Sequence, residues 1–429
     1  MLQAKDKKGC SIMNQISNDA RKIIHDAIQA SLPDEAVKKA ILGKTFDFQG
    51  KVIVIAIGKA AWNMGKAAAE NIPHPIDCGI VLTKYDHAQG QIPGFTILEA
   101  GHPLPDENTI NGTKIIIDAV TDLTEKDTVF FLVSGGGSAL FEKPAGSLTL
   151  PNFLDITDQM LKCGADIVEM NTVRKHLSAV KGGKFAELCA PAHVYCIALS
   201  DILGDRPDSI ASGPACADAS TSEEAFAVVE KYGLKLTDEM KAQLSIETPK
   251  TLSNVTMEIT GSVTQLCEDA AKTARMLGYA PMVLTNMLDC EAKEAGKFLA
   301  SIAKTIQKDG LPLKAPCAVI CGGETIVRIT GKGKGGRNQE LALSAAESIS
   351  GMEGVAIAAA GSDGTDGPTD AAGGIVDGKI KALLAGKGIS IPTVLAENNS
   401  NYALVEADAL IMTGPTGTNV NDLYLLLCK

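Results

Sequence analysis

The sequence predicts a two-domain α/β protein, and three observations support this fold class. Continuous apolar runs that end in glycine, such as KVIVIAIG at 51–58, alternate with helical segments through the first half of the chain. Strands that are apolar on both faces are typical of doubly wound parallel sheets. After residue 255 the runs are less uniformly apolar, which predicts a mixed sheet. The polar stretch 233–254 separates the two sets, so we expect domains at 1–250 and 251–429.

Apolar periodicity places the individual elements in order. The first helix is predicted over 17–42, where Ile23, Ile24, Ala27 and Ile28 share one face. In the first domain, strands are expected at 51–58, 79–83, 96–100, 128–134 and 194–200, with helices at 60–71, 106–122 and 152–165. In the second, a strand begins at 255, a helix spans 265–277, and further strands are expected at 281–285, 318–321, 325–330, 355–360 and 409–412.

Composition excludes several classes of partner. The net charge is -11, no long basic block interrupts the chain, and aromatic residues make up only 4%, so neither nucleic acid nor an anionic membrane surface is expected as a partner. The eleven cysteines are dispersed without CxxC pairs, which favours reduced thiols in the cytoplasm. With no secretory signal and no apolar run of transmembrane length visible, a soluble cytoplasmic protein is expected. The sequence leaves the oligomeric state open, with a homodimer as one candidate.

Polar residues follow the strands of the first domain, where ligands of open α/β sheets bind. Lys59 either neutralises phosphate there or is a solvated helix residue. The segment Ser134-Gly135-Gly136-Gly137-Ser138 is predicted to bind phosphate through backbone N–H groups, with a tight turn as the alternative. Asp201 is a candidate proton acceptor, Mg²⁺ ligand or helix cap. The residues Asn171, Arg174 and Lys175 form either a substrate-anion clamp or a solvated helix surface.

The second domain carries a glycine loop and a carboxylate loop. Gly322, Gly323 and Glu324 close an apolar run and are candidates for phosphate binding. The glycine loop at 331–336 follows with Lys334 and Arg337, a composition suited to phosphate or carboxylate, and Lys334 is a further phosphate-binding candidate. This loop contains G-x-G-x-x-G, but Arg328 interrupts the run before it, which argues against a dinucleotide site. Asp363, Asp366 and Asp370 share one later loop, where turn formation and Mg²⁺ binding are both open and Asp363 and Asp366 are the candidate ligands.

Familiar catalytic motifs are absent from the sequence. It has no Walker loop, no H-R-D with D-F-G, no G-x-S-x-G and no H-E-x-x-H. A kinase built on this chain therefore belongs to neither of the two commonest ATP-binding designs.

The ordered motifs resemble the class II glycerate kinases, whose C-terminal part is the MOFRL domain. The motifs are IGKAA (57–61), GHPLPDENT (101–109), LVSGGGSALFEKP (132–144), NTVRKHLSAVKGGK (171–184), ALSDILGDRPDSIASGP (198–214), CGGET (321–325), GKGGRNQELAL (333–343) and AAGSDGTDGPTDAAGG (359–374). The resemblance runs from about residue 18 to the C-terminus.

This resemblance implies a Rossmann-like N-terminal domain, a mixed-sheet C-terminal domain and an active site in the cleft between them. It also implies ATP, Mg²⁺ and D-glycerate, with 2-phosphoglycerate as product. Carried onto this chain, Lys59 and Arg337 are the catalytic candidates, and Asp201 and Asp363 are candidates for metal binding or proton acceptance.

Two other functions remain open at this point. Some relatives in the family carry the name hydroxypyruvate reductase, and such an enzyme needs NAD(P)H at a well-formed fingerprint. A non-catalytic binding protein for sugar acids needs one anion clamp but no carboxylate-rich loop. The loop with Asp363 and Asp366 therefore favours an enzyme.

Overall fold

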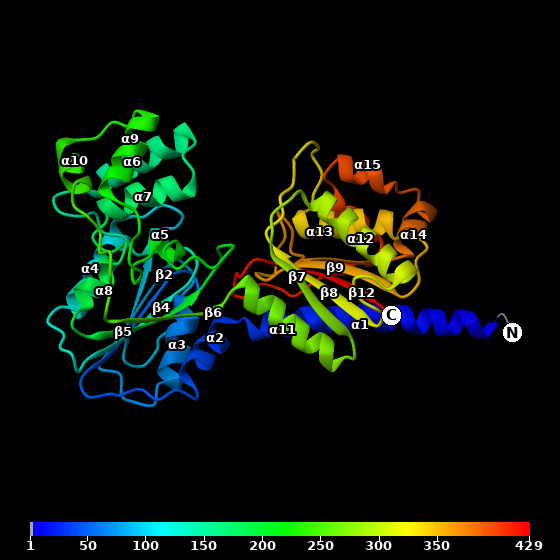
Figure 1. Ribbon diagram of the computed structural model, residues 1–429, viewed down its shortest axis with the longest axis horizontal. Coiled ribbons are helices and arrows are strands. Elements are labelled where there is room, and N and C mark those ends of the chain that lie inside the picture. Colours follow the sequence, from blue (N-terminus) through cyan, green and yellow to red (C-terminus); the bar gives the residue numbers. More distant parts are fainter. Residues whose placement is uncertain (1–2) are drawn as a thin grey trace. The chain divides into compact units, whose positions relative to one another are not determined.

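The computed structural model describes residues 3–429, with side chains described from residue 15 onward. The chain forms two compact units, Pro33–Thr260 and Met1–Leu32 together with Gly261–Lys429. We call them the parallel-sheet unit and the mixed-sheet unit (Figure 1). Among the described residues, no helix is both long and apolar enough to cross a bilayer.

The parallel-sheet unit is built on a six-stranded sheet in the order β3-β2-β1-β4-β5-β6. The pairs β1–β2, β1–β4, β2–β3 and β4–β5 are all parallel, as predicted. The strands are β1 (Val52–Ile57), β2 (Cys78–Lys84), β3 (Phe95–Ala100), β4 (Thr128–Val133), β5 (His193–Leu199) and β6 (Val255–Gly261). The helices are α2 (Pro33–Ile41), α3 (Ala61–Asn71), α4 (Glu107–Ala119), α5 (Gly137–Leu140), α6 (Leu150–Cys163), α7 (Ile167–Leu177), α8 (Lys184–Cys189), α9 (Ser222–Tyr232) and α10 (Asp238–Leu244), with a 3₁₀ turn at Ile210–Ser212.

Both faces of the parallel sheet are buried. Alternate residues of β1 enter two different apolar clusters, Val54 on the side of α2 and α3 and Ile55 on the side of α4 and α8. This is why β1 is apolar throughout its length. Helices α6, α7, α9 and α10 pack around a separate core, which contains Phe153 and Met240, and form a helical layer at one end of the unit (Figure 1).

The mixed-sheet unit has the strand order β11-β10-β9-β12-β8-β7. Pairing is antiparallel from β11 to β8 and parallel between β7 and β8, which confirms the predicted mixed sheet. The strands are β7 (Ala280–Leu288), β8 (Cys317–Gly323), β9 (Val355–Gly361), β10 (Gly373–Asp377), β11 (Leu410–Ile411) and β12 (Asp422–Cys428). The helices are α1 (Gln3–Ala30), α11 (Val263–Met276), α12 (Ala292–Asp309), α13 (Arg337–Ser348), α14 (Ile380–Gly386), α15 (Ile391–Ala396) and α16 (Ser400–Glu406).

The chain's first predicted helix is two helices that belong to different units. Pro33 disfavours helical backbone at the residue before it and lacks an N–H, so α1 ends at Ala30 and α2 begins at Pro33. The apolar face of α1, with Ile23 and Ile24, packs against α11 in the mixed-sheet unit. The compact units thus divide the chain after Leu32 and Thr260, whereas the sequence-based division grouped all of 1–250.

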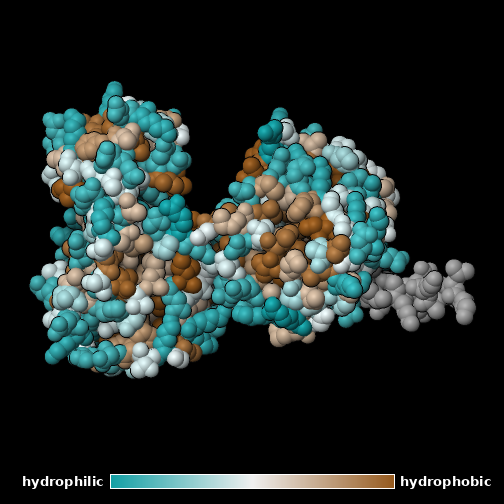
Figure 2. All heavy atoms as spheres, in the orientation of Figure 1, coloured by the Kyte–Doolittle hydropathy of each residue, from teal (hydrophilic) through white to brown (hydrophobic). Residues whose placement is uncertain are grey.

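Two further expectations differ from the structure. Residues 325–330 form no strand; Ile326 makes only an isolated bridge to Glu291, and Ile329 is exposed. The strand β12 was not predicted, although it is fully buried between β8 and β9. The strand β7 lies at one edge of this sheet. Its exposed residues include Val283, Leu284 and Met287, and Figure 2 shows apolar surface in this region.

Candidate active site

Three predicted site segments meet at one edge of the parallel sheet. Because β1, β4 and β5 are parallel neighbours, the residues after them lie together. The backbone N–H of Lys59 donates to the carbonyl of Gly135 over 2.9 Å. A side chain on Gly135 would place its Cβ 2.5 Å from Oδ2 of Asp201. The structure therefore brings together Lys59, the glycine loop at 134–138 and Asp201.

The glycine loop needs glycine at its centre. Gly136 has a φ of 83°, in the left-handed region, and two other side chains lie close to the position that a Cβ there would occupy. A Cβ on Gly136 would lie 3.0 Å from Nε2 of His102 and 3.1 Å from Cγ of Lys59. On Gly137, it would lie 2.8 Å from Cβ of Ala211. The side chains of His102 and Lys59 thus lie against the loop and leave no room for a side chain at Gly136. This close packing explains the glycines better than a simple turn does.

The two serines of this loop have different surroundings. Ser134 is buried; its hydroxyl accepts from Ala60 N over 3.1 Å and donates to Ile57 O over 3.1 Å. These bonds tie β4 to the end of β1, which favours a structural role for Ser134. The hydroxyl of Ser138 lies 3.0 Å from that of Ser212.

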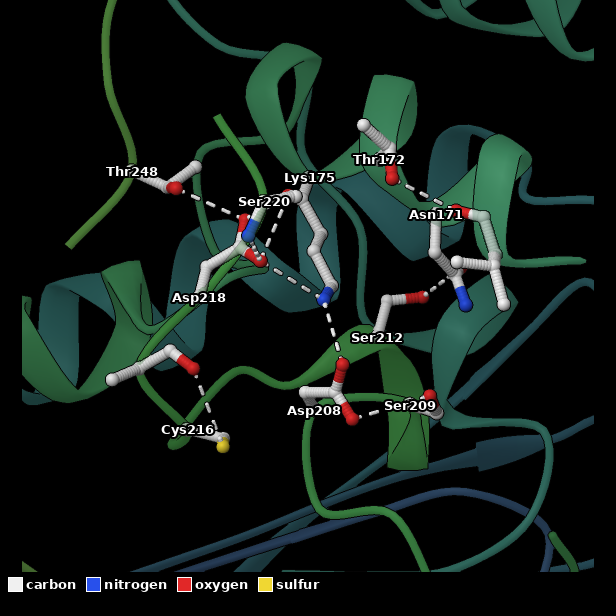
Figure 3. A network of polar contacts seen from close by, with 12 residues as sticks. Asn171, Thr172, Lys175, Asp208, Ser209, Ser212, Cys216, Asp218, Ser220 and Thr248 are labelled. Atoms are coloured by element: carbon white, nitrogen blue, oxygen red, sulfur yellow. Dashed lines mark hydrogen bonds and ion pairs between the residues drawn. The ribbon is translucent and has the colours of Figure 1, made fainter. Parts of the chain in front are cut away.

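Ser138 begins a chain of polar contacts that reaches α7. The Ser212 hydroxyl donates to Oδ1 of Asn171 over 3.0 Å, and Figure 3 shows these two side chains pointing toward each other. Arg174 donates to the carbonyl of Ser138 over 3.2 Å, and burial lowers the pKa of its guanidinium. Ser212 has a φ of 61°, between the left-handed Ala211 and Gly213. Such strained backbone is held in place by surrounding contacts and is common at functional sites.

Lys175 is already neutralised by carboxylates. Its ammonium lies 3.1 Å from Asp218 and 3.6 Å from Asp208, and its side chain is only 5% exposed (Figure 3). Ser220 and Thr248 donate to the same Asp218 carboxylate. A pocket of about 320 Å³ borders this network. The geometry makes Lys175 part of the internal frame, whereas the amide nitrogen of Asn171 has no hydrogen-bond partner among the described residues.

In the mixed-sheet unit, Arg337 is held by two carboxylates. Its Nε and Nη2 donate to the two oxygens of Asp422 over 2.5 and 3.1 Å, and its Nη1 donates to Glu324 over 2.8 Å. Because β12 is antiparallel to β8 and β9, its first residue Asp422 lies at their carboxyl ends. Burial raises the pKa of Asp422 to about 6, although the hydrogen bond from Arg337 opposes this shift. The hydroxyl of Tyr424 also donates to Asp422, over 3.1 Å.

The two predicted metal ligands, Asp363 and Asp366, differ in how many hydrogen bonds their carboxylates accept. Asp366 accepts bonds from the backbone N–H groups of Asn338 and Gln339, and from both of their side chains. It therefore caps α13, and this arrangement leaves it poorly suited to bind a cation. One oxygen of Asp363 accepts from Thr365 N over 3.0 Å. In the part of the chain that the structure describes, no group of three His, Cys, Asp or Glu side chains is arranged around a metal position.

The glycine loop at 331–336 borders a pocket of about 550 Å³. Asn398 accepts from Thr330 N and Gly331 N, and Asn399 from Lys334 N, so part of the loop backbone is already bonded. Lys334 makes no ion pair among the described residues. Arg337, Asp363 and the exposed Ile326 and Ile329 also line this pocket.

Gly322 and Gly323 have a packing reason of their own. A Cβ on Gly322 would lie 2.4 Å from Val263, and one on Gly323 would lie 2.1 Å from the carbonyl of Leu288. These glycines let β8 pack closely against α11 and β7. Their predicted contact with phosphate stays a prediction.

Sequence reasoning missed three residues of these clusters, namely His102, Ser212 and Asp422. Asp422 carries a usable signal, since it directly precedes the apolar run of β12. His102 and Ser212 lie inside motifs that were recognised, but their side chains are placed only by the fold.

The two units define an α/β enzyme that acts on small anions, with basic residues, glycine loops and carboxylates at strand ends. Two family models match the chain: a domain of unknown function, DUF4147, over residues 19–245, and the MOFRL family over 317–422. The D-glycerate 2-kinase of Thermotoga maritima is 52% identical, covering 95% of this chain and 97% of the relative. The glycerate 2-kinase of Pyrococcus horikoshii is 41% identical, covering 95% and 96%.

A solved structure shows the same fold. The crystal structure of a glycerate kinase from Thermotoga maritima has a TM-score of 0.94 and 51% identity, covering 97% of this chain and 100% of that one. The chain belongs to the class II glycerate kinase family, as its motifs predicted.

Proposed function

We propose that this protein transfers the γ-phosphoryl group of ATP to the 2-hydroxyl of D-glycerate. The observation that carries the proposal is the 52% identity, along nearly the whole chain, to a relative named D-glycerate 2-kinase. The choice of the 2-position rests on that relative's name. The clusters around Lys59 and Arg337 are of the kind that such a reaction needs.

Phosphoryl transfer depends mainly on positioning and on positive charge near the transferred group. Lys59 is exposed and lies beside the glycine loop. Other side chains lie so close to the loop that its glycines leave only backbone groups to face a ligand, which suits a loop that binds phosphate. Arg337 is oriented by Asp422 and Glu324, so it loses little freedom when it binds an anion. We assign Lys59 and Arg337 to the reacting phosphate and the glycerate carboxylate, and Asn171 and Arg174 to the substrate's surroundings.

A magnesium ion is part of the proposal. Mg²⁺ is usually held by one or two carboxylates together with substrate phosphates, so a preformed cage is not required. Asp363 fits this role because, among the described residues, only one of its carboxylate oxygens accepts a hydrogen bond, whereas Asp366 is engaged by α13. When bound, the ion would neutralise charge on the phosphate oxygens. In the parallel-sheet unit, Asp201 after β5 is the carboxylate that we assign to the same role of binding Mg²⁺.

The reductase alternative lacks structural support. A dinucleotide fingerprint follows a buried parallel strand and opens a helix. Here residues 325–330 form no strand, and the carboxylate of Asp366 occupies the amino end of α13. This is the position where a pyrophosphate would bind. We also propose a cytoplasmic location, which the ten unpaired cysteines of the described chain support, and leave a homodimer as a candidate assembly.

The test is a steady-state assay with D-glycerate, ATP and Mg²⁺ that resolves 2- from 3-phosphoglycerate. A parallel reaction contains hydroxypyruvate with NADH or NADPH. Magnesium-dependent 2-phosphoglycerate without nicotinamide oxidation is the expected result. Nicotinamide oxidation without any phosphoglycerate would reject the kinase in favour of the reductase.

A further inference from the structure

His102 lies in the GHPLPDENT motif at 101–109, which contributes none of the catalytic or binding residues proposed above. It follows β3, whose carboxyl end lies at the same edge of the parallel sheet as Lys59 and the glycine loop. The Nε2 and Cδ2 atoms of its ring face Gly136, each 3.0 Å from the position that a Cβ there would occupy. The Cγ atom of Lys59 lies 3.1 Å from the same position. One edge of the imidazole therefore lies against the proposed phosphate loop, beside the lysine.

The ring nitrogens of His102 have no hydrogen-bond partner among the side chains and backbone groups that the structure describes. Other histidines of the chain are used internally; Nδ1 of His87, for example, contacts the carbonyl of Lys59, and Nδ1 of His176 contacts that of Thr172. A partly exposed imidazole without a partner, at the edge where the substrates are proposed to bind, is available to a substrate.

We propose that His102 is the catalytic residue that accepts the proton of the attacking glycerate hydroxyl. This inference rests on the proposed kinase function. The 2-hydroxyl oxygen forms a bond to the γ-phosphorus while the bond from that phosphorus to the β,γ-bridging oxygen breaks. The electron pair of the broken bond leaves with ADP, and the hydroxyl proton passes to Nε2 of His102, which becomes an imidazolium. Asp201 is then left for the cation.

The electrostatic surroundings keep the imidazole ready to accept a proton. Burial is the main cause that lowers the pKa of His102, and Lys59, Lys84 and His87 lower it further. These groups come from the turn after β1, the end of β2 and the loop that follows β2, and the glycine loop itself adds no charge. At neutral pH the ring is thus neutral, which a general base requires.

The first test compares kcat over pH 5.5 to 9 for the wild type, His102→Gln and His102→Ala. Glutamine keeps a polar group near the Nε2 position but cannot take up the proton. We expect kcat to fall by ~10²-fold or more, the acidic limb of the kcat profile to disappear, and the KM for D-glycerate to change little. Added imidazole should partly restore His102→Ala. The matched control is His193→Gln at the amino end of β5, where Nε2 contacts Thr256, and it should behave as wild type.

The proposal is overturned if His102→Gln keeps the wild-type kcat and pH profile. It is equally overturned if Asp201→Asn loses the acidic limb while His102→Gln retains it. A wild type that makes no 2-phosphoglycerate would instead reject the proposed function, so the two failures are distinct.

A second measurement needs no folded variant. Wild-type protein is treated with diethyl pyrocarbonate, and modified histidines are mapped by mass spectrometry. Activity should fall in step with modification of His102, and D-glycerate with a non-hydrolysable ATP analogue should protect it. Complete modification of His102 without loss of turnover would contradict its role.

Discussion

Arg337 and Asp422 show how a single residue pair can serve both folding and chemistry. Burial lowers the pKa of Arg337, but the hydrogen bond and charge of Asp422 together with the charge of Glu324 outweigh it and raise that pKa. At Asp422 burial dominates and raises the pKa of the carboxyl to about 6 despite the attraction of Arg337. The side chain of Arg337 is one-third exposed, whereas that of Asp422 is 1% exposed. The buried Asp422 carboxylate therefore fixes the position of a guanidinium that reaches the surface. This arrangement orients a guanidinium toward the adjacent pocket at some cost in stability.

Replacing Arg337 with alanine should reduce turnover by roughly 10³–10⁵-fold, because an arginine that stabilises the transition state contributes that much in phosphoryl transfer. Arg337→Lys should recover only part of this, since lysine cannot bind both carboxylates in the same geometry. Steady-state kinetics and circular dichroism measure turnover and folding together. The control is Arg328→Ala, an exposed arginine nearby. Near-normal turnover in Arg337→Ala would remove it from the catalytic residues.

Asp422 should make stability depend on pH. Its folded pKa, about 6, lies above the usual 3.8, so the folded state retains a proton that the unfolded state has lost. The stabilising contribution is therefore present at low pH, declines as pH rises from about 4 to about 6, and is constant above. By urea unfolding, wild type should lose up to about 3 kcal/mol relative to Asp422→Asn across this window. A constant difference would contradict the linkage.

Among the secondary-structure elements, a buried ion pair lies directly after α5, the short helix that begins within the glycine loop. Glu142 and Lys181 are both fully buried, their charged atoms are 2.8 Å apart, and Lys181 also donates to the carbonyl of Phe141 over 2.8 Å. Burial lowers the pKa of Lys181 to about 8, because the charged ammonium is less stable in the interior than in water. The pair joins the segment after α5 to the segment after α7.

Removing one partner of this pair should be more damaging than removing both. Lys181→Met removes the ion-pair partner of the buried Glu142 and should cost about 3–5 kcal/mol, whereas Glu142→Leu with Lys181→Met should cost much less. Denaturant unfolding of the two single variants and the double variant forms the cycle that measures the coupling. Equal losses in the single and double variants would show that the pair contributes packing rather than electrostatic balance.

At the scale of the whole molecule, the chain's first helix belongs to the unit formed by its last 169 residues, Gly261–Lys429. Besides its apolar face, α1 contributes Asp19, which accepts from Tyr279 and Lys429, and Arg21, which donates to Leu410. The mixed-sheet unit therefore combines α1 with the segment that follows residue 260.

Ile24→Ala in α1 should weaken the mixed-sheet unit selectively. Ile24 is 1% exposed, and truncating a buried isoleucine to alanine costs about 2–5 kcal/mol. Hydrogen exchange followed by mass spectrometry should show faster exchange in 261–429 and little change in 33–260. Leu42→Ala, at an exposed leucine, is the control. Faster exchange confined to 33–260 would contradict the division into units.

The pattern of apolar, glycine and polar residues was sufficient to predict the α/β class, the parallel and mixed sheets, and the position of the main loops. It could do so because buried strands need continuous apolar residues and their carboxyl ends need glycine and polar residues. The family, too, followed from the ordered motifs. Lys59, the glycine loop and Asp201 were predictable as neighbours because they follow adjacent parallel strands.

The folded arrangement of the chain was needed to learn which polar groups are engaged and which are available. Lys175 and Asp366 have suitable chemistry for a site, yet Asp218 neutralises one and α13 uses the other. His102 and Asp422 join their clusters through strands or loops far away in the sequence. Local patterns record burial and backbone geometry, whereas the pairing of side chains is set by strand order and register. The division of roles among these residues is therefore a property of the fold.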